Sequence, residues 1–360
     1  TANLTTDQPH LLEAVTTPNH RVSTLRLTPR EHATVPALPL VAPLVRWLTS
    51  GHARHLSLTR FDLPTDAGLG HALATSPGLS SLELLSSASV VSSLAAHDGP
   101  LPSLTKLDID GCLHEDVARL VARLPLRQMK SLVIKASRVA GTNDPDIGYC
   151  FTTALHDLSA LEHVALKNLR VWGSDALRPT TAPSSTLRTL KFNDVIMSQA
   201  SLNALVRWAT SSKRLASVSW KKCAIFGENT NYAATTLQRC IAAGVRRVAF
   251  LNCGISSMGL EALAETLRAT HVPCELTLHL DGNDLDLVAV RALLEAVATC
   301  TNVWVRLGRL DIVNCPAVAE AVAAGASYNT GPLDTYLYSP ETKEQQARSR
   351  SFSVISLESV

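Results

Sequence analysis

The chain has 360 residues, of which 46% are hydrophobic, so it can bury a sizeable core in one long domain or in two shorter ones. Its 33 basic and 31 acidic residues leave a formal charge of +2, which excludes a whole-molecule field that attracts nucleic acid or membranes. No apolar run is long enough to span a membrane, and the first residues lack the pattern of a secretion signal. We therefore expect a cytoplasmic protein, with the nucleus as the alternative.

Residues 1–21 are polar with little periodicity, and we expect an N-terminal cap or linker that contains a short helix over residues 10–15. After them, the pattern LxxLxLxx(N/C)xL recurs in segments whose first residues lie 25 to 32 positions apart. Eleven segments fit the pattern, and they begin at Val22, Ala53, Leu79, Leu104, Met129, Leu161, Leu187, Leu215, Val245, Glu275 and Asn302.

The fourth and sixth positions of all eleven segments are apolar, from Leu25 and Leu27 in the first segment to Val305 and Leu307 in the last. Side chains two residues apart point to the same face of a strand, so each segment predicts a strand with one buried face. The regular recurrence predicts one strand in each repeat.

Four of the connections between these segments carry apolar residues at the i, i+3, i+4, i+7 spacing of a helix. A strand, a turn and a helix in about 28 residues cannot bury their own apolar faces, so neighbouring repeats must stack into a parallel sheet lined by helices. The four stripes are Val117, Leu120, Val121, Leu124; Leu202, Leu205, Val206, Ala209; Leu260, Leu263, Ala264, Leu267; and Val290, Leu293, Leu294, Val297.

The segments LNCGISSMGLEALAETL and LDGNDLDLVAVRALLEAVA carry Cys253 and Asn283 at their ninth positions. They resemble leucine-rich repeats of the ribonuclease-inhibitor type. The resemblance implies an α/β solenoid over residues 22–327, a curved horseshoe of about eleven repeats with parallel strands on its concave face and helices on its convex face.

The chain departs from the family pattern at several places. The ninth residue, whose polar group satisfies backbone groups of the turn, is apolar in four repeats: Phe61, Leu169, Val195 and Leu310. Residues 141–149 and 179–185 interrupt the pattern, and we expect loops there. Residues 328–360 predict a disordered tail, in which the run from Arg348 to Ser351 is either a kinase target or an ordinary solvated segment.

No sequence motif points to catalysis or to a cofactor, since the chain has no phosphate-binding Gly-rich loop and no GxSxG segment. His114-Glu115-Asp116 lacks the second histidine of a zinc protease and fits a helix start instead. Asp108–Gly111 and Asp281–Asp284 lack the later glutamate of a calcium loop and fit turns. The eight cysteines form no CxxC pair, so we expect reduced, buried thiols. We expect neither an enzyme nor a metal protein.

Positions three, five and seven of each repeat alternate with the buried positions, so function should lie in their side chains. Lysines recur there in the central repeats, where they could form a basic stripe that binds an acidic partner. Alternatively, they extend into water, with Asp108 and Asp110 neutralising one end. The lysines are Lys135, Lys167, Lys191 and Lys221, with Lys222 next to the last of them.

A second cluster of candidate residues lies near the C-terminal end: Arg247, Leu251, His279, Trp304, Arg306 and Arg309. Tryptophan and arginine are the commonest residues at the energetic centre of protein interfaces. Trp304 is either such a residue, exposed on the concave face, or part of a cap packed near Tyr336 and Tyr338.

These features predict a non-catalytic, monomeric scaffold that binds a protein partner with an acidic surface on its concave face. Ribonuclease inhibition is disfavoured because ribonucleases are basic, like the centre of this face. One alternative is an activator of small GTPases, for which Arg60 is the residue to consider. Another is substrate recognition for a ubiquitin ligase, although residues 1–21 do not resemble an adaptor-binding domain.

Overall fold

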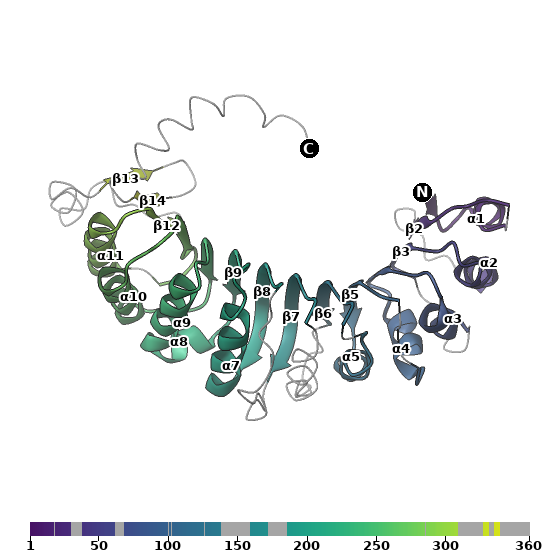
Figure 1. Ribbon diagram of the computed structural model, residues 1–360, viewed down its shortest axis with the longest axis horizontal. Helices are drawn as coiled ribbons and strands as arrows, with labels where there is room; N and C mark the ends of the chain where they lie inside the picture. The colour runs from purple at the N-terminus through teal and green to yellow at the C-terminus, as the bar shows by residue number, and fades with distance from the viewer. Residues whose placement is uncertain are drawn as a thin grey trace. The chain divides into compact units, whose positions relative to one another are not determined.

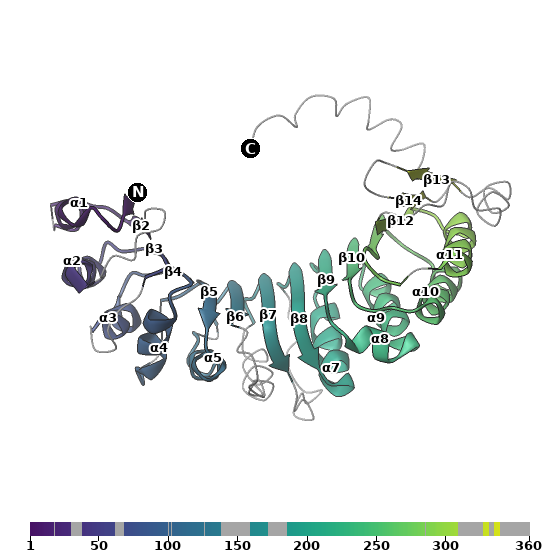
Figure 2. The same cartoon turned by 180° about the vertical axis from the view of Figure 1, so that it is seen from behind.

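Strands and helices alternate along the chain in the computed structural model, which forms two units (Figures 1 and 2). Unit 1 contains Thr1–Leu187 and Val195–Leu205, and unit 2 contains Arg188–Asp194 and Val206–Val360. The structure describes residues 1–17, 19–29, 38–61, 68–99, 101, 103–125, 127–137, 159–171, 186–284, 286–308, 327–330 and 335–338.

In unit 1, each strand pairs in parallel with the next strand along the chain. The strands are β1 (Ala2–Thr5), β2 (Thr24–Thr28), β3 (His55–Thr59), β4 (Ser81–Leu85), β5 (Lys106–Cys112), β6 (Ser131–Ala136) and β7 (His163–Val171). The helices between them are α1 (Pro9–Val15), α2 (Leu38–Thr49), α3 (Leu69–Thr75), α4 (Ala88–Ala96) and α5 (His114–Val121).

Unit 2 continues the alternation with β8 (Thr189–Met197) and α7 (Gln199–Thr210), both of which have residues in each unit. Next come β9 (Ser217–Lys221), α8 (Ile225–Glu228), α9 (Thr230–Ala242), β10 (Arg247–Leu251), α10 (Ser257–Ala269), β11 (Leu276–His279), α11 (Leu287–Thr299) and β12 (Val303–Gly308). Strands β8 to β12 are parallel, and β13 (Ser327–Thr330) and β14 (Thr335–Tyr338) form an antiparallel pair whose second strand lies antiparallel to β12.

The predicted strand of every repeat is present, since β2 to β12 coincide with the eleven segments of the sequence pattern. The fourth and sixth positions of all eleven are at most 2% exposed. Neighbouring strands also pair at equivalent positions, for example Leu25 with Leu56 in unit 1 and Val218 with Val248 in unit 2. The four predicted helical stripes are likewise buried. The alternating α/β arrangement is therefore confirmed.

Both ends of the repeat array differ from the prediction. The helix predicted at residues 10–15 is present as α1, but residues 2–5 form an additional strand, β1, which pairs in parallel with β2. The expected linker is thus another strand–helix unit, joined to the sheet by backbone hydrogen bonds that a polar segment can form as readily as an apolar one. The predicted tail begins inside β13, and the described parts of it are the strands β13 and β14.

Other predicted features fall outside the described residues. They are the loops at 141–149 and 179–185, the run from Arg348 to Ser351, and the side chains of Arg309 and Leu310. Among the residues that the structure does describe, no helix is long and apolar enough to cross a membrane.

The turn after each strand has a repeated backbone geometry. The eighth position adopts positive φ in both units, as in Arg60 (50°), Asn168 (54°), Lys222 (54°) and Gly282 (74°). A residue in this left-handed conformation reverses the chain tightly, so the strand ends at the same place in successive repeats. Asp281–Asp284 is such a turn, as the sequence predicted.

Polar side chains at the ninth position bind the turn of the preceding repeat. The Asn283 Oδ1 atom accepts hydrogen bonds from the backbone N–H groups of Cys253 (3.0 Å) and Ile255 (3.2 Å), while its Nδ2 group donates to the carbonyls of Phe250 (2.7 Å) and Leu280 (2.8 Å). Where Phe61 departs from the pattern, Ser87 of the next repeat accepts the hydrogen bond of its N–H group (3.0 Å). Ser87 is itself a ninth residue, so its bond to Phe61 follows the same rule as the bond of Asn283 to Cys253.

The thiols of five of the six described cysteines are buried, as predicted. Burial raises the pKa of Cys112 and Cys240 to about 12 and that of Cys253 to about 11. Cys274 is partly exposed. Alkylation requires both access and the thiolate form, and Cys274 differs from the buried cysteines in its access.

Iodoacetamide at pH 8 should therefore modify Cys274 of the native protein well before Cys112, Cys240 or Cys253. At that pH, a thiol with a pKa of 12 is ionised in only about one molecule in 10⁴. Peptide mass spectrometry after timed labelling measures each site separately, and unfolding in guanidinium should make the rates equal. Equal rates in the native protein would contradict the burial of these thiols.

Candidate binding site on the strand face of unit 2

The side chains at positions three, five and seven of β8 to β12 lie on the sheet face opposite the buried side chains. The pairing registers arrange them in rows across the strands. One row runs through Lys191, Ser219, Ala249, His279 and Arg306, each on a different strand. Residues far apart in the sequence are therefore neighbours on this face.

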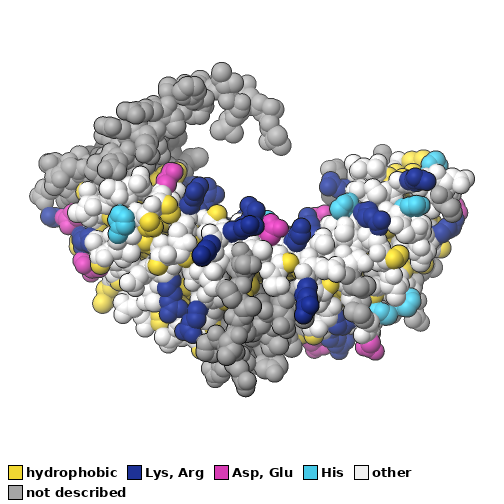
Figure 3. All heavy atoms as spheres, in the orientation of Figure 1, with side chains coloured by type: hydrophobic (Ala, Val, Ile, Leu, Met, Phe, Trp, Pro, Cys, Tyr) yellow, Lys and Arg dark blue, Asp and Glu magenta, His cyan; other side chains and the backbone are white. Residues whose placement is uncertain are grey.

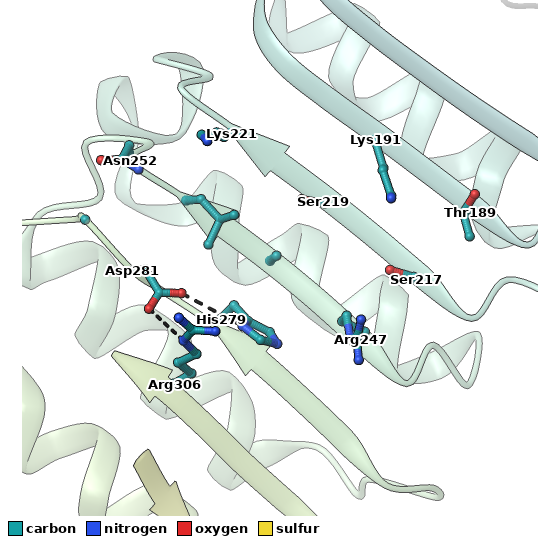
Figure 4. A pocket seen from close by; sticks show the side chains of 13 residues that line it. Thr189, Lys191, Ser217, Ser219, Lys221, Arg247, Asn252, His279, Asp281 and Arg306 are labelled. Atoms are coloured by element: carbon teal, nitrogen blue, oxygen red, sulfur yellow. Dashed lines mark ion pairs between the residues drawn. The ribbon is translucent and has the colours of Figure 1, made fainter. Parts of the chain in front are cut away.

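A pocket of about 710 Å³ opens on this face (Figure 4). Its hollow has a physical cause, because Ser217, Ser219 and Ala249 on the central strands are small and the side chains around them are longer. The lining residues are Thr189, Lys191, Ser217, Ser219, Lys221, Arg247, Ala249, Leu251, Asn252, His279, Asp281, Gly282 and Arg306. All of them belong to unit 2. We call this site the strand-face pocket.

Positive charge dominates the lining of the strand-face pocket. Its four cations are Lys191, Lys221, Arg247 and Arg306, and Asp281 is its one carboxylate, so the formal charge is 4 − 1 = +3 with His279 neutral. Figure 3 shows Lys and Arg side chains over unit 2, and others over unit 1. The pocket can therefore attract an anion although the whole chain is nearly neutral.

Asp281 organises one side of the pocket. Its Oδ1 atom lies 3.0 Å from the Arg306 Nε atom, and its Oδ2 atom lies 3.9 Å from the His279 Nδ1 atom. Figure 4 shows the three side chains turned toward one another, with His279 and Asp281 at the end of β11 and Arg306 on β12. Arg306 is thus held in place by a carboxylate, and part of its charge is offset.

Lys191, Lys221 and Arg247 differ from Arg306 because they form no ion pair with any residue that the structure describes. All three side chains are exposed. They lie on β8, β9 and β10, around the small residues of the pocket floor. Their charges are available to a ligand.

The structure divides the predicted lysine stripe between the two units. Lys135 and Lys167 of unit 1 are paired in register on β6 and β7. The Lys135 Nζ atom lies 4.0 Å from Asp108 Oδ1 and 3.7 Å from Asp110 Oδ2. The alternative in which these aspartates neutralise one end of the stripe therefore applies to Lys135.

Burial raises the pKa of the Asp108 carboxyl, while Lys135 lowers it, and Glu83 on the neighbouring strand raises it further. The described strand face of unit 1 thus mixes carboxylates with lysines on adjacent strands. The described strand face of unit 1 therefore lacks the excess of cations found in unit 2.

Arg60, the residue considered for GTPase activation, is exposed in the turn after β3 of unit 1.

Within unit 2, the pocket brings together residues from both predicted clusters: Lys191 and Lys221 from one, and Arg247, Leu251, His279 and Arg306 from the other. Lys222 lies outside the lining, in the turn after β9. Trp304 is partly buried, also outside the lining, and its backbone is paired with Tyr338 of β14. The backbone arrangement therefore agrees with the cap alternative for Trp304.

The site residues predicted from the sequence do not include Ser217, Ser219, Ala249, Asn252 or Asp281. The first three occupy positions three and five, so the alternation does indicate their orientation. The predicted candidates were charged and aromatic residues, so small side chains were not among them. The small side chains nevertheless create the hollow of the pocket. Asp281 was predicted only as a turn residue; its partner His279 lies two residues before it, but its partner Arg306 is on β12 and distant in sequence from the turn motif.

Within the described ranges, no group of three His, Cys, Asp or Glu side chains could hold a metal ion. Comparison with protein-family models and with curated proteins gave no match.

Proposed function

We propose that this chain is a leucine-rich-repeat protein of the ribonuclease-inhibitor-like type, and that it binds the acidic surface of a partner protein without catalysing a reaction. The observation that carries the binding proposal is the strand-face pocket, in which four cations surround a floor of small side chains and only Asp281 opposes them. We place the partner on this pocket.

The turns support the repeat type. In the leucine-rich-repeat pattern, the ninth residue is Asn or Cys and its polar group satisfies backbone groups of the turn. Asn283 does so here with four hydrogen bonds. The Cys253 thiol donates to the carbonyls of Trp220 and Leu251, both at 3.5 Å. The recurring positive φ at the eighth position fits the same repeat.

The charges of the pocket support an acidic partner. Like charges on neighbouring strands repel one another, and an anionic surface that docks over them removes this cost. The same charges accelerate encounter with an acidic protein at low ionic strength. We therefore expect partner binding to weaken as salt is added.

Charge reversal tests this function. We expect an affinity pull-down to recover at least tenfold less partner protein when the full chain carries Lys191→Glu, Lys221→Glu and Arg247→Glu. Each substitution turns an attractive contact into a repulsive one. The matched control is Lys213→Glu, Arg214→Glu and Arg246→Glu, which makes the same change of charge in unit 2 at exposed residues outside the lining.

Quantitative mass spectrometry of the recovered proteins compares the two variants with the unmodified chain. We expect the control to keep its partner and the pocket variant to lose it, with both proteins showing the same circular dichroism spectrum. Equal recovery by the pocket variant and the unmodified chain would rule out the strand-face pocket as the binding site.

A further inference from the structure

Building on the proposed function, we infer that the strand-face pocket recognises a phosphorylated side chain of the partner protein. The phosphoryl group would lie over Ser219, bound by Lys191, Lys221 and Arg247. The inference specifies which acidic group of the partner is recognised and which three cations recognise it.

Ser219 lies at the centre of the cationic part of the pocket. Lys191 on β8 is opposite Ser219. Lys221 lies two residues after Ser219 on β9. Arg247 is opposite Ser217 on β10, diagonally next to Ser219. Neighbouring strands are about 4.8 Å apart and alternate residues of a strand about 6.7 Å apart, so all three cationic side chains originate within reach of one phosphoryl group.

The floor contributes donors as well as space. The hydroxyl groups of Ser217 and Ser219 line the pocket between the cations, and Ala249 leaves room beside them. Figure 4 shows Lys191 and Arg247 on either side of the strand that carries the two serines. A bound phosphoryl group can therefore accept hydrogen bonds from hydroxyl groups below it and ion pairs from the sides.

The number of available cations favours a phosphoryl group over a carboxylate. A phosphorylated serine or threonine carries a charge of about −1.5 to −2 and has three strong acceptor oxygens. A carboxylate carries −1 and two oxygens, which one arginine can satisfy in a bidentate pair. Three cations that form no ion pair with any described residue exceed what a single carboxylate requires.

The remaining charged groups are compatible with this ligand. Asp281 would repel a phosphoryl group, but it lies on the far side of the pocket from Lys191 and its Oδ1 atom is paired with Arg306 at 3.0 Å. Arg306 is thus engaged by Asp281, whereas Lys191, Lys221 and Arg247 are left for the ligand.

A protein segment fits the pocket better than a nucleic acid. Single-stranded nucleic acids are held by stacking of their bases on aromatic side chains along a charged groove. Apart from the imidazole of His279, the lining contains no aromatic ring. A formal charge of +2 for the chain also gives little general attraction for a polyanion.

The test uses the full chain and an array of degenerate nine-residue peptides with phosphoserine, serine or glutamate at the central position. The best phosphoserine sequence is then labelled and titrated by fluorescence anisotropy. We expect it to bind at least tenfold more tightly than the same peptide with serine or glutamate.

Substituting Lys191→Gln, Lys221→Gln or Arg247→Gln should each weaken this binding by about ten- to hundredfold, because each removes one charged hydrogen bond. Arg247→Lys keeps the charge but loses the bidentate geometry, so its effect should be smaller. Lys213→Gln is the matched control, since this exposed lysine lies outside the lining, and it should bind like the unmodified chain.

Several results would overturn the inference. Equal binding of glutamate and phosphoserine peptides would exclude phosphoryl recognition while leaving an acidic partner in place. Tighter binding of inositol hexakisphosphate or of a single-stranded RNA than of any phosphopeptide would assign the pocket to another ligand class. If no peptide binds, phosphoryl recognition is wrong, and the charge-reversal pull-down still decides the proposed function independently.

Discussion

Replacing Asn283 with leucine should lower the free energy of unfolding by about 4 kcal/mol or more, because four backbone groups lose their partner and each loss of a buried hydrogen bond costs at least about 1 kcal/mol. The groups are the N–H donors of Cys253 and Ile255 and the carbonyls of Phe250 and Leu280. Urea denaturation followed by circular dichroism measures the change.

Two further variants make this prediction specific. Asn283→Asp keeps an oxygen acceptor but loses both amide donors, so its effect should be smaller than that of leucine. Asn231→Leu changes an exposed residue near the start of α9 and should alter stability by no more than about 0.5 kcal/mol. A loss below about 1 kcal/mol for Asn283→Leu would show that the turns do not depend on this side chain.

Replacing Trp220 with alanine should lower the free energy of unfolding by about 3–5 kcal/mol, the range for removing a large aromatic side chain from a core. Trp220 is fully buried on β9. Its ring stacks on Phe250 with centroids 5.1 Å apart, and it packs edge-to-face against Phe226 at 5.3 Å. The substitution therefore opens a cavity within an aromatic cluster.

Trp220→Phe should cost much less than Trp220→Ala. The indole N–H group is buried and finds no acceptor among the described residues, so phenylalanine removes an unsatisfied donor and keeps an aromatic ring in place. Thermal unfolding of both variants checks this order. A phenylalanine variant as unstable as the alanine variant would show that the indole ring itself is required.

Trp220 also connects the core to the candidate site. It lies between Ser219 and Lys221 on β9, with its side chain directed to the opposite face of the sheet. The packing of this residue helps hold the strand that forms the middle of the pocket floor. Loss of peptide binding in Trp220→Ala would therefore reflect unfolding of β9, whereas loss in Lys221→Gln would not.

Much of the candidate site could be predicted from the sequence. The alternation of buried and exposed positions correctly selected Lys191, Lys221, Arg247, His279 and Arg306 as residues of the strand face. The same rule could not separate these five from Lys135, which has a similar position in its repeat. The difference is that Lys135 lies near two aspartates, and only interatomic distances show that pairing.

The sequence by itself determined the strand positions and their buried faces. Each repeat has apolar residues two positions apart, and a shift of one residue would turn them all to solvent, so the register follows from the pattern. The tertiary structure alone decided which exposed residues become neighbours. Lys191 and Arg306 line one pocket because parallel pairing brings β8 to β12 side by side, and the small residues between them leave it hollow. Ion pairing then holds Arg306 against Asp281 and leaves Lys191, Lys221 and Arg247 for a ligand, which depends on side-chain distances that no sequence period encodes.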